Sequence, residues 1–179
     1  MATVADLLKR SAELSPASDS ALLDTELLLC HCLDVSRTWL MTWPEHQPSP
    51  DQLASFELLF KRRLDGEPVA FITGTQGFWT LDLAVSPHTL IPRPETELLV
   101  DAALELEFPG NINVLDLGTG TGAIALALAA ERPDWQVTAV DVQPQAVARS
   151  LLTPVSAVVL FHLQSAEGEK IGIGTSTQS

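Results

Sequence analysis

Residues 112–141 read Ile-Asn-Val-Leu-Asp-Leu-Gly-Thr-Gly-Thr-Gly-Ala-Ile-Ala-Leu-Ala-Leu-Ala-Ala-Glu-Arg-Pro-Asp-Trp-Gln-Val-Thr-Ala-Val-Asp. The apolar residues predict a short strand over 113–117 and a second strand over 137–141. Between them, the run 123–131 is rich in alanine and leucine and predicts a helix. Strand, glycine-rich loop, helix and strand form a βαβ unit, which implies a parallel sheet and an α/β fold.

The glycine-rich loop of this unit allows a ligand to approach the backbone closely. Gly118, Gly120 and Gly122 lack the Cβ atoms that would block that approach. The helix that follows presents free backbone N–H groups to ligand oxygens. Asp141 follows at about the 20-residue spacing at which an acid accepts hydrogen bonds from both hydroxyls of a ribose. The unit therefore predicts a nucleoside-containing ligand.

Two ligands fit this loop. Gly118, Gly120 and Ala123 match the dinucleotide pattern G-x-G-x-x-G/A. The pattern D-x-G-x-G-x-G, the first signature of S-adenosylmethionine methyltransferases, begins at Asp116. An acid at this position suits the cationic amino-acid end of S-adenosylmethionine and would repel a pyrophosphate, so methyltransferase is favoured and a nicotinamide-dependent oxidoreductase is the alternative. The predicted cofactor site consists of Asp116, Gly118, Thr119, Gly120, Thr121, Gly122 and Asp141.

The rest of the chain predicts a different organisation. Residues 1–65 predict a small bundle of four short amphipathic helices, a packing or docking module without chemistry of its own. Its clearest start signal is Ser49 as N-cap, with Pro50 at the first helical position and Gln52 at the third. Residues 66–91 predict a β-hairpin linker, since apolar and polar residues nearly alternate near its centre.

Residues 92–149 predict the partial S-adenosylmethionine-binding domain. Its first helix is expected to open at Pro94 and to bury Leu98, Leu99, Ala102 and Leu106. After Arg149 the pattern changes: Pro154 interrupts a helix, a strand is possible within 155–163, and the Gly-, Ser- and Thr-rich end predicts disorder.

Composition excludes several classes of function. The net charge of −13 argues against sequence-independent nucleic-acid binding, which needs clustered Lys and Arg. No apolar run is long enough to cross a bilayer and the N-terminus lacks a signal-peptide core, so a cytoplasmic protein is expected. Cys30, His31 and Cys32 are successive helical positions that cannot converge on one ion, so no metal site is predicted.

Several stretches together resemble one family. They are Gly-Glu-Pro-Val-Ala-Phe-Ile-Thr-Gly at 66–74, Phe78-Trp79, Leu-Ile-Pro-Arg-Pro-Glu-Thr-Glu at 90–97, and the glycine loop. Over residues 1–149 the chain resembles the HemK/PrmC family, which N5-methylates the glutamine of the Gly-Gly-Gln motif in peptide chain release factors. The resemblance implies a Rossmann-like sheet, S-adenosylmethionine as cofactor and release factors as partners.

The resemblance also implies residue roles. The loop from Gly118 to Gly122 would cradle the cofactor, Asp141 would hold its ribose and Asp116 would face its methionine end. Thr96 would touch the carboxylate of the cofactor, although helix-start chemistry explains Glu95 and Thr96 equally well.

One departure from the family bears on activity. The family's catalytic motif is Asn-Pro-Pro-Tyr, which hydrogen-bonds the substrate amide. This chain has no tyrosine, and its last asparagine is Asn113. No catalytic residue is therefore predicted, and we expect little or no transferase activity. Residues 150–179 form a tail that does not resemble the family. A truncated or frame-shifted product, a shortened natural variant and a mis-predicted gene end all fit this pattern. A non-catalytic module that binds release factors is the alternative function.

Overall fold

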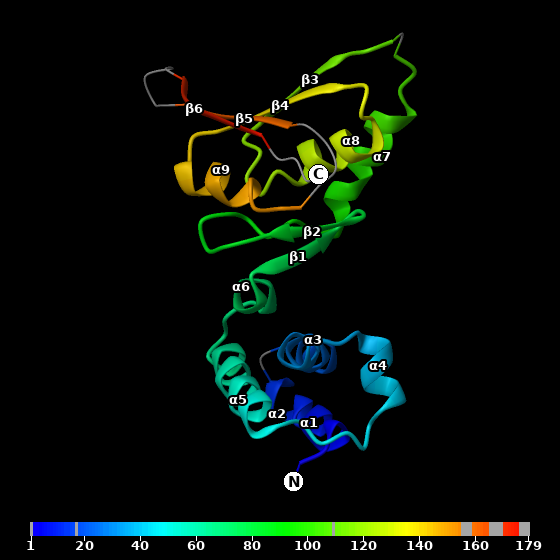
Figure 1. The fold of residues 1–179 in the computed structure, drawn as a ribbon, viewed down its shortest axis with the longest axis vertical. Helices are drawn as coiled ribbons and strands as arrows, with labels where there is room; N and C mark the ends of the chain where they lie inside the picture. Colours follow the sequence, from blue (N-terminus) through cyan, green and yellow to red (C-terminus); the bar gives the residue numbers. More distant parts are fainter. Residues whose placement is uncertain (1, 17, 109, 155–158, 165–169, 176–179) are drawn as a thin grey trace. The chain divides into compact units, whose positions relative to one another are not determined.

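The structure is a computed structural model that describes residues 2–16, 18–108, 110–154, 159–164 and 170–175 (Figure 1). It contains two compact units, Met1–Thr73 and Gly74–Ser179. Within the described residues, no helix combines the length and the apolar character needed to cross a membrane.

The first unit is a small helical bundle. Its described helices are α1 (Val4–Lys9), α2 (Ser11–Leu14), α3 (Ala21–Leu33), α4 (Arg37–Thr42), α5 (Pro50–Leu64) and α6 (Val69–Thr73). The start of α5 is confirmed as predicted: the Ser49 hydroxyl accepts from Gln52 N, and the Gln52 side chain accepts from Ser49 N. These reciprocal bonds satisfy two backbone donors that the helix leaves without partners.

The core of this unit lies between α3 and α5. Its largest fully buried side chains are Leu14, Leu28, Leu29, Leu40, Phe56 and Phe60. Phe56 and Phe60 lie one turn apart on α5 with ring centroids 5.2 Å apart, and the guanidinium of Arg10 lies 4.4 Å from the centroid of the Phe60 ring.

The segment predicted as a hairpin linker contains a helix as well as a hairpin. Pro68 starts α6 because its carbonyl accepts from Phe71 N and Ile72 N. The hairpin that follows is shorter than residues 66–91, with β1 (Thr75–Phe78) antiparallel to β2 (Leu81–Ala84). The prediction from alternating apolar and polar residues did not reveal α6. Pro68 is compatible with a helix start and also with an extended segment.

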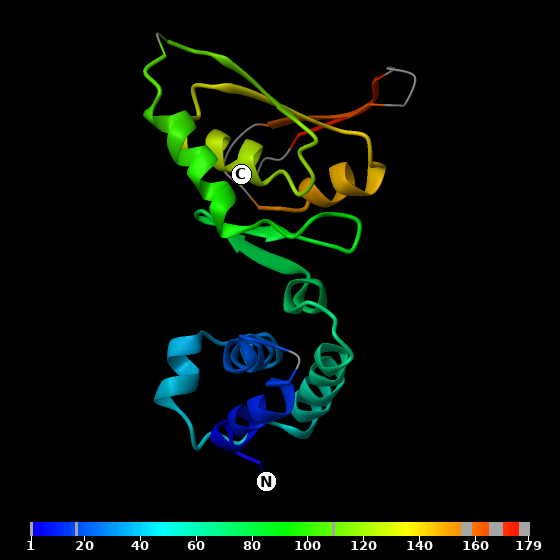
Figure 2. The same cartoon turned by 180° about the vertical axis from the view of Figure 1, so that it is seen from behind.

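The second unit is a four-stranded sheet with helices on one face. Its remaining elements are a 3-10 turn η1 (Pro94–Thr96), α7 (Glu97–Glu105), β3 (Asn113–Leu117), α8 (Ala123–Glu131), β4 (Gln136–Asp141), α9 (Pro144–Ser150), β5 (Val159–Gln164) and β6 (Lys170–Thr175). The order is β3-β4-β5-β6, with β3, β4 and β5 parallel and β6 antiparallel to β5. Figures 1 and 2 show α8 and α9 on the same face of the sheet. The predicted α/β fold is therefore confirmed.

The helix α8 explains why this unit can form a core. Ala125, Leu126, Ala127, Leu128 and Ala129 are all buried, so α8 is enclosed on most of its circumference. It packs with the buried face of β4 and β5, where Val137, Ala139 and Val159 are buried. This packing fixes the start of α8, and therefore the glycine loop, against the ends of the strands.

Two local predictions were wrong. Leu98, Leu99 and Leu106 of the first helix are exposed, as is Ala102, and α7 instead buries Val100. Apolar residues occur on both sides of this helix, so periodicity alone could not select the buried side. The C-terminal end, residues 168–179, was expected to be disordered but contains β6 over residues 170–175. Residues 168–169 and 176–179 of that prediction lie outside the described residues. The available edge of β5 gives this segment a partner.

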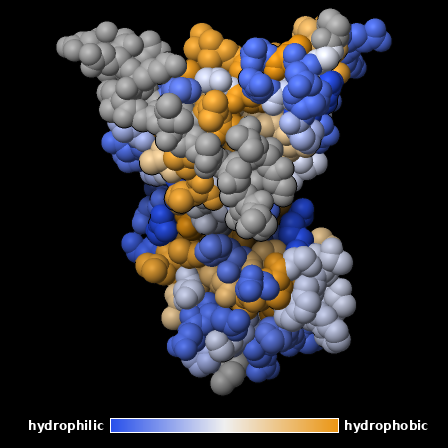
Figure 3. All heavy atoms as spheres, turned by 45° about the horizontal axis from the view of Figure 1, so that its top comes forward, coloured by the Kyte–Doolittle hydropathy of each residue, from blue (hydrophilic) through white to orange (hydrophobic). Residues whose placement is uncertain are grey.

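One face of the sheet presents apolar side chains to solvent. Leu115 and Leu117 alternate with Val114 and Asp116 along β3, and they are 59% and 70% exposed. Figure 3 is turned so that the top of Figure 1 comes forward, and it shows hydrophobic surface on this unit among hydrophilic side chains. Among the described residues, β3 pairs only with β4, so its other edge offers free backbone groups.

The free edge and the exposed apolar face of β3 predict that the chain self-associates. The double substitution Leu115→Lys and Leu117→Lys is expected to keep the chain monodisperse at higher concentration, since lysine on an edge strand disfavours edge-to-edge pairing. Its effect on stability should be about 0.5 kcal/mol or less per site because both side chains are exposed. Light scattering against concentration measures the first effect. Leu58→Lys, an equally exposed site on α5, is the matched control; equal improvement by both variants would contradict the role of β3.

Candidate functional site

The glycine loop between β3 and α8 requires its glycines for conformational reasons. Gly118, Gly120 and Gly122 have φ angles of +73°, +57° and +79°. This left-handed region strains residues with a Cβ atom. A Cβ placed on Gly118 or Gly120 would meet no atom within 4 Å, so packing against the protein does not explain either glycine. Both positions instead face open space that a ligand can enter.

The end of β4 holds this loop in place. Because β3 and β4 are parallel, their carboxyl ends lie at the same edge of the sheet. The backbone N–H groups of Gly118 and Thr119 donate to Val140 O at 2.8 and 3.1 Å. Gly120 N donates to Asp141 Oδ2 at 2.8 Å, and Gln143 N donates to Asp141 Oδ1 at 2.9 Å. Asp141 is thus buried and directly bonded to the loop that it was predicted to accompany.

A hollow of about 210 Å³ lies beside the loop. It is lined by Leu90, Ile91, Pro92, Arg93, Thr96, Asp116, Gly118, Thr119, Gly120, Thr121, Ala123 and Ile124. Five of the seven predicted site residues therefore line one hollow, together with Thr96. Gly122 caps α8 behind the loop, and Asp141 contacts the loop without lining the hollow.

Asp116 is the acidic group of this hollow. Burial raises the pKa of its carboxyl, and the neighbouring negative charge of Asp141 adds to the increase. Two hydrogen bonds oppose the shift, one from the Ala125 backbone N–H and one from the Thr119 hydroxyl, which lies 2.6 Å from Asp116 Oδ2. A cation in the hollow would compensate for the burial of the ionised carboxylate.

Five residues of the segment 90–96 also line the hollow. Leu90, Ile91, Pro92 and Arg93 precede the 3-10 turn η1, and Thr96 is the last residue of that turn. Sequence reasoning did not assign Arg93. The sequence did contain a signal for Arg93, because Arg93 is the basic residue of the motif at 90–97 on which the resemblance rests.

Glu97 of the same motif holds the hairpin in place through a hydrogen bond. Its Oε1 accepts from Trp79 N at 2.7 Å, and Trp79 has an unusual φ of +56° at the turn of the hairpin. Trp79 Nε1 in turn donates to Glu131 Oε1 at 2.7 Å. These bonds connect the hairpin to α7 and α8. Glu97 therefore orders the wall of the hollow without lining it.

The cysteine pair lies outside this site. Cys30, His31 and Cys32 are successive residues of α3, and among the described residues no group of three possible ligands could hold a metal ion. Burial raises the pKa of the Cys32 thiol to about 11 and also raises that of Cys30. Both thiols are therefore mostly protonated at neutral pH, which disfavours the reactive thiolate.

Family models match both units of the chain. The PrmC N-terminal domain matches residues 6–74, and the methyltransferase small domain matches residues 94–163. The second match begins at η1, contains the glycine loop and Asp141, and extends past Arg149 into β5.

Curated relatives are similar over the same region. A release factor glutamine methyltransferase of Pseudomonas aeruginosa is 57% identical over 148 residues, which are 83% of this chain and 53% of that protein. Proteins of the same name from Vibrio cholerae and Escherichia coli are 51% and 48% identical, over 72% and 73% of this chain and 45% and 47% of their own lengths. The chain thus spans about half the length of the curated relatives it matches.

Proposed function

The chain belongs to the release factor glutamine methyltransferase family, and from that membership we propose that its second unit binds S-adenosylmethionine at the glycine loop. The family activity that we propose for the complete protein is methylation of a release-factor glutamine. S-Adenosylmethionine supplies a methyl group bound to a sulfonium, which a nucleophile can attack directly. The residues described here would bind and orient this cofactor.

One observation carries the proposal. The hollow brings Asp116 and the glycine loop against Thr96, although these residues come from two separate segments of the chain. Asp116 suits the ammonium of the amino-acid end, whereas beside a pyrophosphate its charge would be repulsive. The same residue therefore argues against the dinucleotide alternative.

The size of the hollow limits what it holds. Sites that enclose a whole drug-sized ligand have volumes of about 300–1,000 Å³, and this hollow has about 210 Å³. We therefore assign the amino-acid end of the cofactor to the hollow and its ribose to Asp141, outside it. Asp141 has a second lone pair on each oxygen and can accept from ribose hydroxyls while it holds Gly120 N and Gln143 N.

Calorimetric titration of the purified chain with S-adenosylmethionine tests the proposal. The wild-type chain is expected to bind, and Asp141→Ala to bind about tenfold more weakly because it loses hydrogen bonds to a charged acceptor. Asp141→Asn keeps the shape and one acceptor oxygen, so it separates loss of charge from collapse of the loop. Asp134→Asn, an exposed acid of the same unit, is the matched control. Binding of a nicotinamide dinucleotide in place of S-adenosylmethionine would support the oxidoreductase alternative.

A further inference from the structure

A second pocket of this unit lies at the opposite end of the sheet from the glycine loop. It has a volume of about 420 Å³, and its lining residues include Leu106, Ile112, Val114, Leu128 and Trp135. Ile112 precedes β3 and Trp135 precedes β4, which places this Trp135 pocket at the amino ends of two parallel strands. The glycine loop follows the carboxyl end of β3, and the hollow beside it shares no lining residue with the Trp135 pocket.

The lining of the Trp135 pocket limits the chemistry of a ligand. The described residues that line it are all uncharged, and among them only Asn113 and Trp135 carry a polar group on the side chain. Small-molecule sites typically have volumes of about 300–1,000 Å³ and combine apolar walls with a few polar groups. The pocket therefore suits a neutral, mostly apolar molecule. A carboxylate is disfavoured, because no described lining residue is cationic.

The indole of Trp135 contributes a hydrogen-bond donor without an acceptor. Trp135 is 4% exposed, and among the residues that the structure describes its Nε1 has no hydrogen-bond partner. Leaving a buried donor unpaired costs free energy, so nearly all such groups in folded proteins have a partner. The partly buried Trp79 of the same unit follows this rule, because its Nε1 donates to Glu131. An acceptor oxygen on a ligand would supply what Trp135 lacks.

Two side chains hold the ring of Trp135 in place. The guanidinium of Arg132 lies 4.6 Å from the ring centroid and is itself paired with Asp134. Phe108 packs edge-on against the same ring, with centroids 5.9 Å apart, and it is 42% exposed. Because Nε1 is covered, a ligand reaches it by displacing part of that cover. We expect Phe108 to move, since it lines the pocket and makes no ion pair that would hold it.

We propose that the Trp135 pocket binds a neutral, mostly apolar small molecule through a carbonyl oxygen that accepts a hydrogen bond from Trp135 Nε1. The hydrocarbon part of the ligand packs against the apolar walls of the pocket, where its removal from water favours binding. Ketones, esters and amides with a hydrocarbon body belong to this class of ligand. The site goes beyond the proposed function, because it uses none of the residues assigned to the cofactor.

Acetophenone and ethylbenzene are matched probes for this site. Both carry a phenyl ring with a two-carbon substituent, and only acetophenone has a carbonyl oxygen. In the full ¹⁵N-labelled chain, the indole N–H of Trp135 reports the hydrogen bond, and those of Trp39, Trp43 and Trp79 are internal controls. We expect acetophenone to shift the Trp135 indole signal much more than ethylbenzene does. The backbone amide of Val114 gives the affinity of each probe.

The substitution Trp135→Phe removes the donor and keeps an apolar ring. The ratio of the two affinities cancels the difference in hydration between the probes, and we expect Trp135→Phe to lower the preference for acetophenone about fivefold. Trp43→Phe, which changes an exposed tryptophan outside the pocket, should leave the ratio unchanged.

Three results would overturn the proposal. The first is that acetophenone shifts neither the Val114 amide nor the Trp135 indole of the wild-type chain. The second is that the affinity ratio is the same in Trp135→Phe and in the wild type. If Trp135→Phe does not fold, the wild-type spectra decide: equal shifts of the Trp135 indole by the two probes contradict the hydrogen bond, and a shift by acetophenone alone supports it.

Discussion

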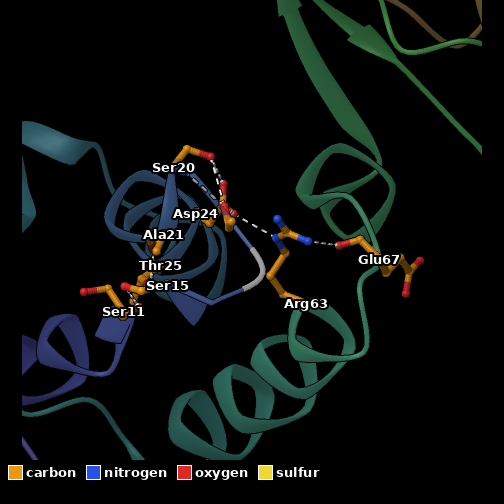
Figure 4. Close-up of polar contacts among 9 residues, drawn as sticks. Ser11, Ser15, Ser20, Ala21, Asp24, Thr25, Arg63 and Glu67 are labelled. Carbon is orange, nitrogen blue, oxygen red and sulfur yellow. Dashed lines mark hydrogen bonds and ion pairs between the residues drawn. The ribbon is translucent and has the colours of Figure 1, made fainter. Parts of the chain in front are cut away.

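Replacing Arg63 with methionine is expected to destabilise the N-terminal unit by about 3 kcal/mol. Arg63 Nε lies 2.8 Å from Asp24 Oδ2, and the two side chains are only 14% and 10% exposed. Asp24 also accepts from the Ser18 hydroxyl at 2.7 Å. Figure 4 shows its contacts with Arg63 and with the Ser20 hydroxyl, the latter at 3.0 Å. Without the guanidinium, the carboxylate stays buried with its charge uncompensated, which costs more than the loss of the contact itself.

Native-state hydrogen exchange of backbone amides in α3 and α5 measures this loss within the unit. Arg62→Met is the matched control, because Arg62 pairs with Glu67 at a more exposed site and should contribute about 1 kcal/mol or less. The double variant Arg63→Met with Asp24→Leu removes both charges and should recover much of the stability. Equal protection in wild type and Arg63→Met would show that the pair is energetically unimportant.

The ion pair of Asp24 and Arg63 makes the stability of the N-terminal unit depend on pH. Burial alone would raise the pKa of Asp24, but hydrogen bonds from Ser18, Arg63 and Ser20 outweigh it, and the pKa is lowered. A carboxyl with a lowered native pKa stabilises the fold fully above its unfolded pKa of about 3.9. That contribution is lost as the pH falls below this value through the native pKa. The loss of amide protection in α3 as the pH falls should therefore be smaller in Asp24→Asn than in the wild-type chain.

The parts predicted correctly from sequence are those whose causes are local. The run 113–141 contains strand, loop, helix and strand in an order that hydrophobic periodicity resolves, and the structure shows β3, α8 and β4 there. The capping residues Ser49 and Gln52 act within one helical turn, so their pattern is readable without the fold.

The parts that were missed depend on distant partners. The buried side of α7 is chosen by contact with α8, and β6 forms because β5 offers an edge. Glu97 accepts a hydrogen bond from Trp79, which lies in the hairpin, so its role depends on a residue distant in the sequence. That Arg93 and Asp116 line one hollow is visible only in the folded chain, because they come from separate segments. Sequence therefore indicated the glycine loop and Thr96, but not that residues 90–93 line the same hollow.

We expect the 179-residue chain to methylate a release factor at least about 100-fold more slowly than a full-length relative, even where it binds S-adenosylmethionine. An amide nitrogen is a poor nucleophile, so transfer depends on holding it in line with the methyl–sulfonium bond. The hydrogen-bonding side chains that line the hollow are Arg93, Thr96, Asp116, Thr119 and Thr121. None of these is the asparagine or tyrosine of the family's catalytic motif, and the chain has no tyrosine and no asparagine after Asn113.

Mass spectrometry of the release-factor peptide that contains the Gly-Gly-Gln motif measures transfer, with cofactor binding measured on the same sample. A full-length relative assayed in parallel shows that the release factor is a competent substrate. Retention of the release factor without methylation would favour the non-catalytic binding module. Transfer close to the rate of the relative, abolished by Asp141→Ala, would contradict the prediction. It would mean that other groups in this chain hold the amide, and residues 164–179, which lie beyond the methyltransferase domain match, would be the first place to look for them.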